Sequence, residues 1–304
     1  HSGVDFSLYK PATIHRRIDS RLVLNNNSSL ADYTRFLNGN VRELEALYSD
    51  VLICVTSFFR NPETFEVLKR QILPGLLKPK HGHGDDDPLR VWVLGCSTGQ
   101  EAYSIAMLFV EAAEKAGRTR KLQVFATDVN EALLGKARLG LYPKSLANEM
   151  TPQRLRRFFV EEHGGYRISK VLRDMVVFAR QNLIADPPFS RMDLISCRNL
   201  LIYLEPGLQQ KAIPTFHYAL KPGGFLMLGA SESIGGFSNL FQLVDKKHRL
   251  YSRKPALPRS SQPVAGFQLN ARAPVSLRPP LLPLQSIEAP PGPQGAVGEL
   301  SAQR

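Results

Sequence analysis

Apolar residues follow two different spacings along the chain. Up to about residue 80 they recur at helical intervals, and Ile14, Ile18 and Leu22 lie on one face of a predicted helix. A later helix is predicted to begin at Asn61, an N-cap residue followed by proline. From residue 89 onward, short apolar runs alternate with helical stretches. These runs predict buried strands at 89–95, 121–128, 176–180, 192–197 and 224–229.

Strands that alternate with helices predict an α/β fold, with a mostly parallel sheet covered by helices on both faces. The changes in spacing divide the chain into a helical domain (1–80), a polar linker (81–88), an α/β domain (89–253) and a tail (254–304). Gly165–Ser169 and the segment after it predict a small hairpin outside the main sheet, at about 163–180. The tail contains 10 of the 22 prolines, which is typical of a disordered linker.

Charge and composition narrow the function classes. The chain has 39 lysines and arginines against 27 acidic residues, a net charge of +12, which favours an acidic partner. It has no zinc-finger or RNP-type motif and no run of five basic residues, so nucleic-acid binding is not expected. No apolar run predicts a membrane span and no signal peptide is expected. Three widely spaced cysteines favour a reducing cytoplasm over a disulfide framework.

The segment Val93–Glu101 predicts a strand, a turn of small residues and the start of a helix. Gly95 and Gly99 allow backbone N–H groups to approach a ligand, and a helix N-terminus favours a negative group there. The glycines also suit a tight turn without any ligand. The same segment spells G-x-S-x-G, the nucleophile pattern of serine hydrolases, with Ser97 as the nucleophile. A hydrolase needs a later acid and base, and the chain offers Asp193 with His217 or His248.

Three further positions have chemistry of their own. Asp128 ends the second predicted strand, where an acid can accept hydrogen bonds from both ribose hydroxyls of an adenosine cofactor or cap the next helix. The glycine turn is not G-x-G-x-x-G, which argues against a nicotinamide cofactor. Arg60 is either a carboxylate clamp or a surface arginine. His81 and His83 lie beside three aspartates, but a solvated loop is favoured there over a metal site.

Five stretches, in order along the chain, resemble the chemotaxis receptor methyltransferase (CheR) family over residues 4–253. They are Val55–Arg60, Gly95–Met107, Ala126–Asn130, Gln181–Leu183 and Cys197–Tyr203. Leu220–Ser233 is similar to a late strand of class I methyltransferases. The resemblance implies a class I S-adenosylmethionine-dependent methyltransferase, with a Rossmann-like sheet, an N-terminal all-α domain and a small inserted antiparallel β-subdomain. It implies a cytoplasmic enzyme of chemotaxis signal transduction that forms γ-carboxylate methyl esters on glutamates of chemoreceptors.

The resemblance also implies the cofactor, S-adenosylmethionine, with S-adenosylhomocysteine as product, and the residues that hold it. Thr56, Arg60 and Glu101 would hold the methionine end, and Asp128 would bind the ribose. Asn182 and Leu183 would line the adenine. The full set of implied cofactor-binding positions is Thr56, Arg60, Gly95, Ser97, Glu101, Asp128, Asn182, Leu183, Arg198 and Asn199.

Catalytic and partner-binding roles follow from the same resemblance. Tyr203 would face the methyl-transfer centre, and Arg60 would orient the acceptor carboxylate. The basic residues that lie off the apolar stripe of the first helix would dock on acidic receptor helices, namely Arg16, Arg17 and Arg21. No metal and no nucleic acid are implied.

Two departures from the family pattern affect these expectations. Cys54 stands where most relatives have asparagine, which would remove one hydrogen bond to the cofactor. The predicted β-subdomain is short, which predicts an enzyme that does not depend on a receptor C-terminal pentapeptide. A degenerate module that binds cofactor or receptor without catalysis is the alternative function, with a serine hydrolase third. The first residue, His1, and the proline-rich tail lead us to expect a piece of a larger protein fused to other signalling domains.

Overall fold

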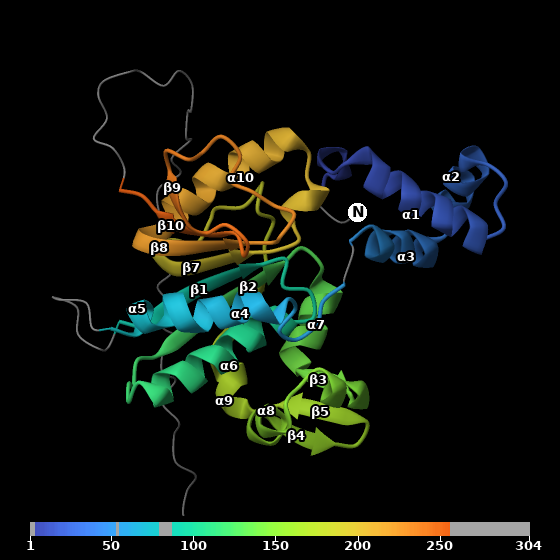
Figure 1. Ribbon diagram of the computed structural model, residues 1–304. Coiled ribbons are helices and arrows are strands. Elements are labelled where there is room, and N and C mark those ends of the chain that lie inside the picture. Colours follow the sequence, from blue (N-terminus) through green and yellow to red (C-terminus); the bar gives the residue numbers. More distant parts are fainter. Residues whose placement is uncertain (1–3, 53–54, 79–86, 256–304) are drawn as a thin grey trace, which may run out of the picture. The chain divides into compact units, whose positions relative to one another are not determined.

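The first part of the chain forms a group of three helices. The computed structural model describes residues 4–52, 55–78 and 87–255 (Figure 1). A short 3-10 turn, η1 (Phe6–Leu8), precedes α1 (Pro11–Leu24), α2 (Leu30–Gly39) and α3 (Val41–Val51). Side-chain caps fix the starts of α2 and α3, because Ser29 accepts from the backbone of Asp32 and Asn40 accepts from the backbone of Glu43. Cys54, residues 81–86 of the linker and residues 256–304 of the tail lie outside the described residues.

The next helical stretch packs with the sheet. It comprises α4 (Pro62–Val67), a π-helical segment η2 (Leu68–Ile72) and α5 (Leu73–Leu77). Leu68, Ile72 and Leu76 are buried in the same apolar cluster as the strand residues Val91 and Val124. Residues 62–77, which the sequence places in the helical domain, therefore share the core of the larger domain.

A seven-stranded sheet, in the order β6-β2-β1-β7-β8-β10-β9, forms the centre of that domain. β1, β2, β6, β7 and β8 pair in parallel, whereas β10 is antiparallel to both β8 and β9. This arrangement confirms the predicted α/β class. The strands are β1 (Leu89–Leu94), β2 (Leu122–Asp128), β6 (Val176–Arg180), β7 (Met192–Cys197), β8 (Leu220–Leu228), β9 (Phe241–Asp245) and β10 (Leu250–Arg253).

Helices cover both faces of this sheet. Figure 1 shows α10 (Pro206–Ala219) on one side of the sheet, and α4 and α6 (Gln100–Lys115) on the other. Alternate residues of β1 face opposite sides, because Val91 and Val93 pack in the cluster with α6, whereas Trp92 and Leu94 pack in the cluster with α10. α7 (Glu131–Leu139) follows β2, and α9 (Lys170–Asp174) precedes β6. Among the described residues, no helix is both long enough and apolar enough to cross a membrane.

A small antiparallel sheet lies outside the main one. Its strands are β3 (Leu141–Pro143), β5 (Gly165–Ile168) and β4 (Phe159–Glu162), in that order, and η3 (Lys144–Asn148) and α8 (Pro152–Phe158) lie between β3 and β4. The sequence predicted this subdomain at about 163–180, so its position differs from the prediction. Residues 170–174 are helical, and 176–180 form the edge strand β6 of the main sheet. The strands at 141–143 and 159–162 are too short to show a clear alternation in the sequence.

Candidate functional site

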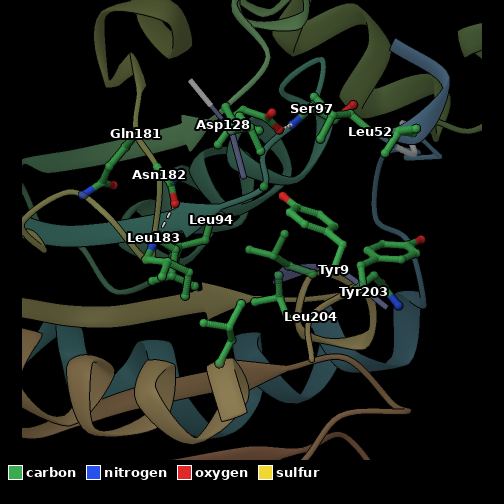
Figure 2. Close-up of a pocket in the computed structure, with 18 of the residues that line it drawn as sticks. Tyr9, Leu52, Leu94, Ser97, Asp128, Gln181, Asn182, Leu183, Tyr203 and Leu204 are labelled. Carbon is green, nitrogen blue, oxygen red and sulfur yellow. Dashed lines mark hydrogen bonds between the residues drawn. The ribbon is translucent and has the colours of Figure 1, made fainter. Parts of the chain in front are cut away.

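A pocket opens at the carboxyl ends of the parallel strands β1, β2, β6 and β7 (Figure 2). In open α/β sheets this edge is where ligands bind. The pocket holds about 970 Å³, counting the solvent at its mouth. The predicted site residues in its wall are Gly95, Ser97, Asp128, Asn182, Leu183, Asn199 and Tyr203.

The turn after β1 supplies the first wall. Gly95 has a φ of 61°, a left-handed conformation that favours glycine, and a Cβ there would lie 3.4 Å from Leu200 Cδ1. Ser97 also has a left-handed backbone, with a φ of 51°. The backbone N–H of Ser97 donates to Asp128 Oδ2 at 2.8 Å. Its Oγ is buried and has no hydrogen-bond partner among the described residues, so it is available to a ligand.

Asp128 stands at the tip of β2. Its carboxylate accepts from two backbone N–H groups, those of Ser97 and Asn130, at 2.8 and 2.9 Å. These bonds fix its orientation and still leave lone pairs for two further donors. Burial raises the pKa of Asp128, and the backbone hydrogen bonds oppose that rise. The helix-capping role falls to Asn130, whose side chain accepts from the backbone N–H of Ala132 at 3.1 Å.

The segment after β6 forms the opposite wall. Asn182 Oδ1 accepts from the backbone N–H of Ile184 at 3.0 Å, which holds Leu183 against the pocket. Gln181, which the sequence analysis did not single out, also lines the pocket. Its amide donates to Pro187 O at 2.8 Å, and its buried Oε1 has no partner among the described residues.

The loop after β7 carries Asn199 and Tyr203, and a buried acid holds its backbone. Glu232 Oε2 accepts from the N–H groups of Gly229 and Asn199 at 2.6 and 2.9 Å, and its Oε1 accepts from that of Ile202 at 3.3 Å. Glu232 is only 4% exposed, and burial raises its pKa. Asn199 has a φ of 58°, so this loop adopts a backbone that needs outside support. The sequence offered no sign that Glu232 points inward.

The predicted residues Thr56, Arg60, Glu101 and Arg198 are absent from the pocket wall. Glu101 and Arg198 pair with each other beside the pocket. The Arg198 side chain is 2% exposed and donates to Glu101 Oε2 at 3.0 Å. Arg198 also donates to the backbone oxygen of Arg60 at 2.8 Å and to Asn61 Oδ1 at 2.9 Å. Asn61 is the N-cap residue of α4 by position, but its side chain binds Arg198 and caps no N–H. The Arg60 guanidinium donates to Val55 O at 2.8 Å.

The N-terminal segment contributes a wall that the sequence did not predict. The pocket is lined by residues that lie before α1 and at the end of α3, namely Val4, Asp5, Tyr9, Val51 and Leu52. No local motif marks them, because their contact with the strand tips depends on how distant parts of the chain fold together.

The three arginines of α1 do not share one environment. Arg21 lies inside the helical domain, where its Nε donates to Glu43 Oε1 at 2.8 Å and its Nη1 lies 3.3 Å from Asp50 Oδ2. Glu43 is buried and also accepts from the Tyr33 hydroxyl at 2.7 Å. Arg21 was expected to dock on a receptor helix together with Arg16 and Arg17, whereas in the structure it pairs with a buried acid of its own domain. Arg16 is exposed and Arg17 is half-buried.

The geometry opposes the serine hydrolase. No histidine lines the pocket in the described part of the chain. Asp193 binds Lys221 at 2.9 Å, His217 contacts the backbone oxygen of Lys254, and His248 pairs with Asp245. The candidate acid and bases are thus engaged elsewhere, and none of the described residues that line the pocket with Ser97 is a histidine, lysine or arginine.

Taken together, the lining suits a nucleoside with a polar tail. The Asp128 carboxylate can accept hydrogen bonds from the two adjacent hydroxyls of a ribose. The apolar side chains of Leu94, Leu133 and Leu183 can enclose the base ring. Ser97 Oγ and Gln181 Oε1 are buried polar atoms that need partners. Within the described parts of the chain, the lining includes two aspartates and no lysine, arginine or histidine, so the pocket favours a cationic ligand.

Comparison with known families assigns both parts of the chain. Residues 54–250 match the S-adenosylmethionine-binding domain of the CheR methyltransferases. Residues 1–52 match the all-α domain of the same family. These limits agree with the packing of residues 62–77 against the sheet.

Three known proteins are similar to parts of this chain to different degrees. An uncharacterized 104.1 kDa protein of Rhodobacter capsulatus is 39% identical over 90% of this chain, and the chain spans 29% of that protein's length. A chemotaxis protein methyltransferase of Listeria monocytogenes is 35% identical over 76% of this chain and 85% of its own. A solved TehB-like methyltransferase of Corynebacterium glutamicum is 14% identical over 60% of this chain and 85% of its own, with a TM-score of 0.35.

Proposed function

The chain belongs to the CheR methyltransferase family, and from that premise we propose that it methylates glutamate side chains on the cytoplasmic domains of chemoreceptors. The fold is that of a class I methyltransferase, and S-adenosylmethionine is the cofactor of the matched domain. The named chemotaxis methyltransferases among its relatives support a role in chemotaxis. The observation that supports cofactor binding most directly is the pocket at the strand tips, with Asp128 in its wall.

The pocket residues suit the cofactor as follows. Asp128 would accept from the ribose hydroxyls, and Asn182 and Leu183 would flank the adenine. Ser97 Oγ would meet the methionine end near the start of α6. The cluster of Arg198 and Glu101 adjoins this end and would hold the loop around it.

The chemistry needs no proton transfer from the protein. Bound S-adenosylmethionine supplies a methyl group on a positively charged sulfur. A glutamate side chain is already ionised at neutral pH, with an ordinary pKa of about 4.3, so it needs no base to act as the nucleophile. This agrees with a pocket wall whose titratable residues are Asp5, Tyr9, Asp128 and Tyr203. The chain's own contribution is to orient the carboxylate and exclude water, and good positioning alone lowers such barriers by several kcal/mol.

The partner would be an acidic helical surface. The net charge of +12 and the exposed Arg16 on α1 favour such a partner, with Arg17 at the edge of the same surface. Arg21 has no part in docking in this proposal, because it is paired within the domain. The natural setting of such a reaction is the cytoplasm.

Calorimetric titration with S-adenosylmethionine and S-adenosylhomocysteine tests the cofactor, and transfer of a labelled methyl group to a receptor fragment tests the reaction. We expect both ligands to bind, and the label to be released as methanol by mild alkali, as carboxyl esters require. Asp128→Ala should abolish both results, whereas the matched control Asp174→Ala, an exposed residue of α9, should change neither. Binding without transfer would support the degenerate module. No binding at all would contradict the proposed function.

A further inference from the structure

The first residues of the chain are attached to the loop that carries Tyr203. Tyr9 forms an antiparallel bridge with Leu204, and the backbone N–H of Lys10 donates to Tyr203 O at 2.9 Å. The Phe6 ring packs against the rings of Tyr9 and Tyr48, with centroids 5.4 and 5.9 Å apart. This segment belongs to the all-α domain, yet it reaches the pocket of the other domain.

The side chain of Tyr9 extends into the pocket. Figure 2 shows its ring between Tyr203 and the turn that carries Ser97, at a distance from Gln181 and Leu183. Its hydroxyl has no hydrogen-bond partner among the described residues, although the residue is half-buried. Burial and the nearby Asp128 carboxylate raise the pKa of Tyr9 to about 12, so the hydroxyl keeps its proton at neutral pH. Tyr9 is therefore a neutral donor that faces the ligand space.

The charge of the wall makes such a donor necessary for an anionic acceptor. Asp5 and Asp128 line the pocket, and none of the described residues in its wall has a basic side chain. These acids suit a positively charged sulfur but repel a second carboxylate. At the Tyr203 end, the side-chain donors in the wall are those of Tyr9, Asn199 and Tyr203.

We propose that the Tyr9 hydroxyl donates a hydrogen bond to one carboxylate oxygen of the acceptor glutamate and so orients the other oxygen toward the methyl group. This proposal rests on the proposed function and adds an acceptor-binding residue from the all-α domain. In the transfer, the free carboxylate oxygen forms the new bond to the methyl carbon, and the carbon–sulfur bond breaks with its electron pair passing to sulfur. Tyr9 keeps its proton throughout. The hydrogen bond weakens as the carboxylate becomes a neutral ester, which favours release of the product.

The test uses Tyr9→Phe in the full chain, because this change removes one oxygen atom that has no partner in the described residues. The matched control is Tyr218→Phe on α10, a residue that is 72% exposed. We expect kcat/KM for a receptor fragment to fall by about 10- to 100-fold in Tyr9→Phe, the effect of losing one hydrogen bond to a charged group. The affinity for S-adenosylhomocysteine and the thermal unfolding midpoint should match those of the control.

Two results would overturn the proposal. One is an unchanged kcat/KM, and the other is a loss of S-adenosylhomocysteine affinity as large as the loss of kcat/KM, which would place Tyr9 on the cofactor. These results can be distinguished from failure of the proposed function itself. In that case the unsubstituted chain would methylate no receptor carboxylate at all.

Discussion

Glu232 gives the sharpest test of how the pocket is built, because one buried carboxylate holds three backbone N–H groups around the Tyr203 loop. The substitution Glu232→Gln keeps the shape and one oxygen. That oxygen can still serve Gly229 and Asn199, but the amide NH₂ then faces the N–H of Ile202. The substitution therefore removes the hydrogen bond that holds the loop near Tyr203.

The magnitude follows from the contacts. A hydrogen bond to a charged group contributes about 1.5–3 kcal/mol, and an unpaired buried donor costs about 1–3 kcal/mol. Glu232→Gln also removes the free-energy cost of burying a charge, and that burial is what raises the pKa of Glu232. We therefore expect a net loss of stability of about 1–2 kcal/mol. A displacement of the loop by about 1 Å can slow transfer by about 100-fold, so we expect kcat to fall by about 10- to 100-fold.

Urea denaturation and steady-state methyl transfer measure the two effects. Glu161→Gln is the matched control, because Glu161 is exposed on β4. Glu232→Ala, which leaves all three donors unpaired, should be less stable than Glu232→Gln. Equal stability and equal kcat for Glu232→Gln and its control would refute the view that this acid positions the loop.

Other predictions concern Asp128 as the proposed ribose-binding acid, Tyr203 as the proposed catalytic tyrosine, and the helical domain. Tyr203→Phe should leave S-adenosylhomocysteine affinity unchanged but slow transfer, and a loss of affinity would contradict its assignment to the transfer centre. Burial raises the pKa of Asp128, so cofactor affinity should decline as the pH falls while still above the ordinary aspartate value of about 3.9, and Asp128→Asn should remove this pH dependence in calorimetry. Arg21→Ala leaves Glu43 buried with fewer partners, so it should destabilise the helical domain by about 2–4 kcal/mol in denaturant unfolding. Arg16→Ala should change stability by less than about 0.5 kcal/mol but weaken receptor binding; equal stability losses in these two variants would contradict the assignment of their environments.

The sequence pattern was sufficient to predict those elements that are determined by residues close together in the chain. The strand at 89–94 and the acid at the tip of the next strand were visible because buried parallel strands are continuous apolar runs that end in turns. Once these strands are parallel, their carboxyl ends must meet at one edge, which brings Gly95, Ser97 and Asp128 together.

Contacts between distant segments could not be predicted in this way. Arg16 and Arg21 look alike in the sequence, and only the packing of α1 on α3 pairs Arg21 with Glu43. Glu232 lies in a polar run that is typical of a surface turn, yet it points inward to backbone donors. Tyr9 is almost 200 residues from Leu204 in the chain, and no periodicity reports their bridge.

Methyl esters on receptor glutamates would be the chemical trace of the proposed reaction, with the cofactor held in the strand-tip pocket. The most direct measurement is mass spectrometry of a chemoreceptor cytoplasmic fragment incubated with the full chain and S-adenosylmethionine that carries an isotope-labelled methyl group. We expect labelled methyl groups on specific glutamate side chains, and we expect them to be lost on mild alkaline treatment and absent with Asp128→Ala. Labelled methyl groups on lysine, cysteine or another side chain, or alkali-stable ones, would contradict it.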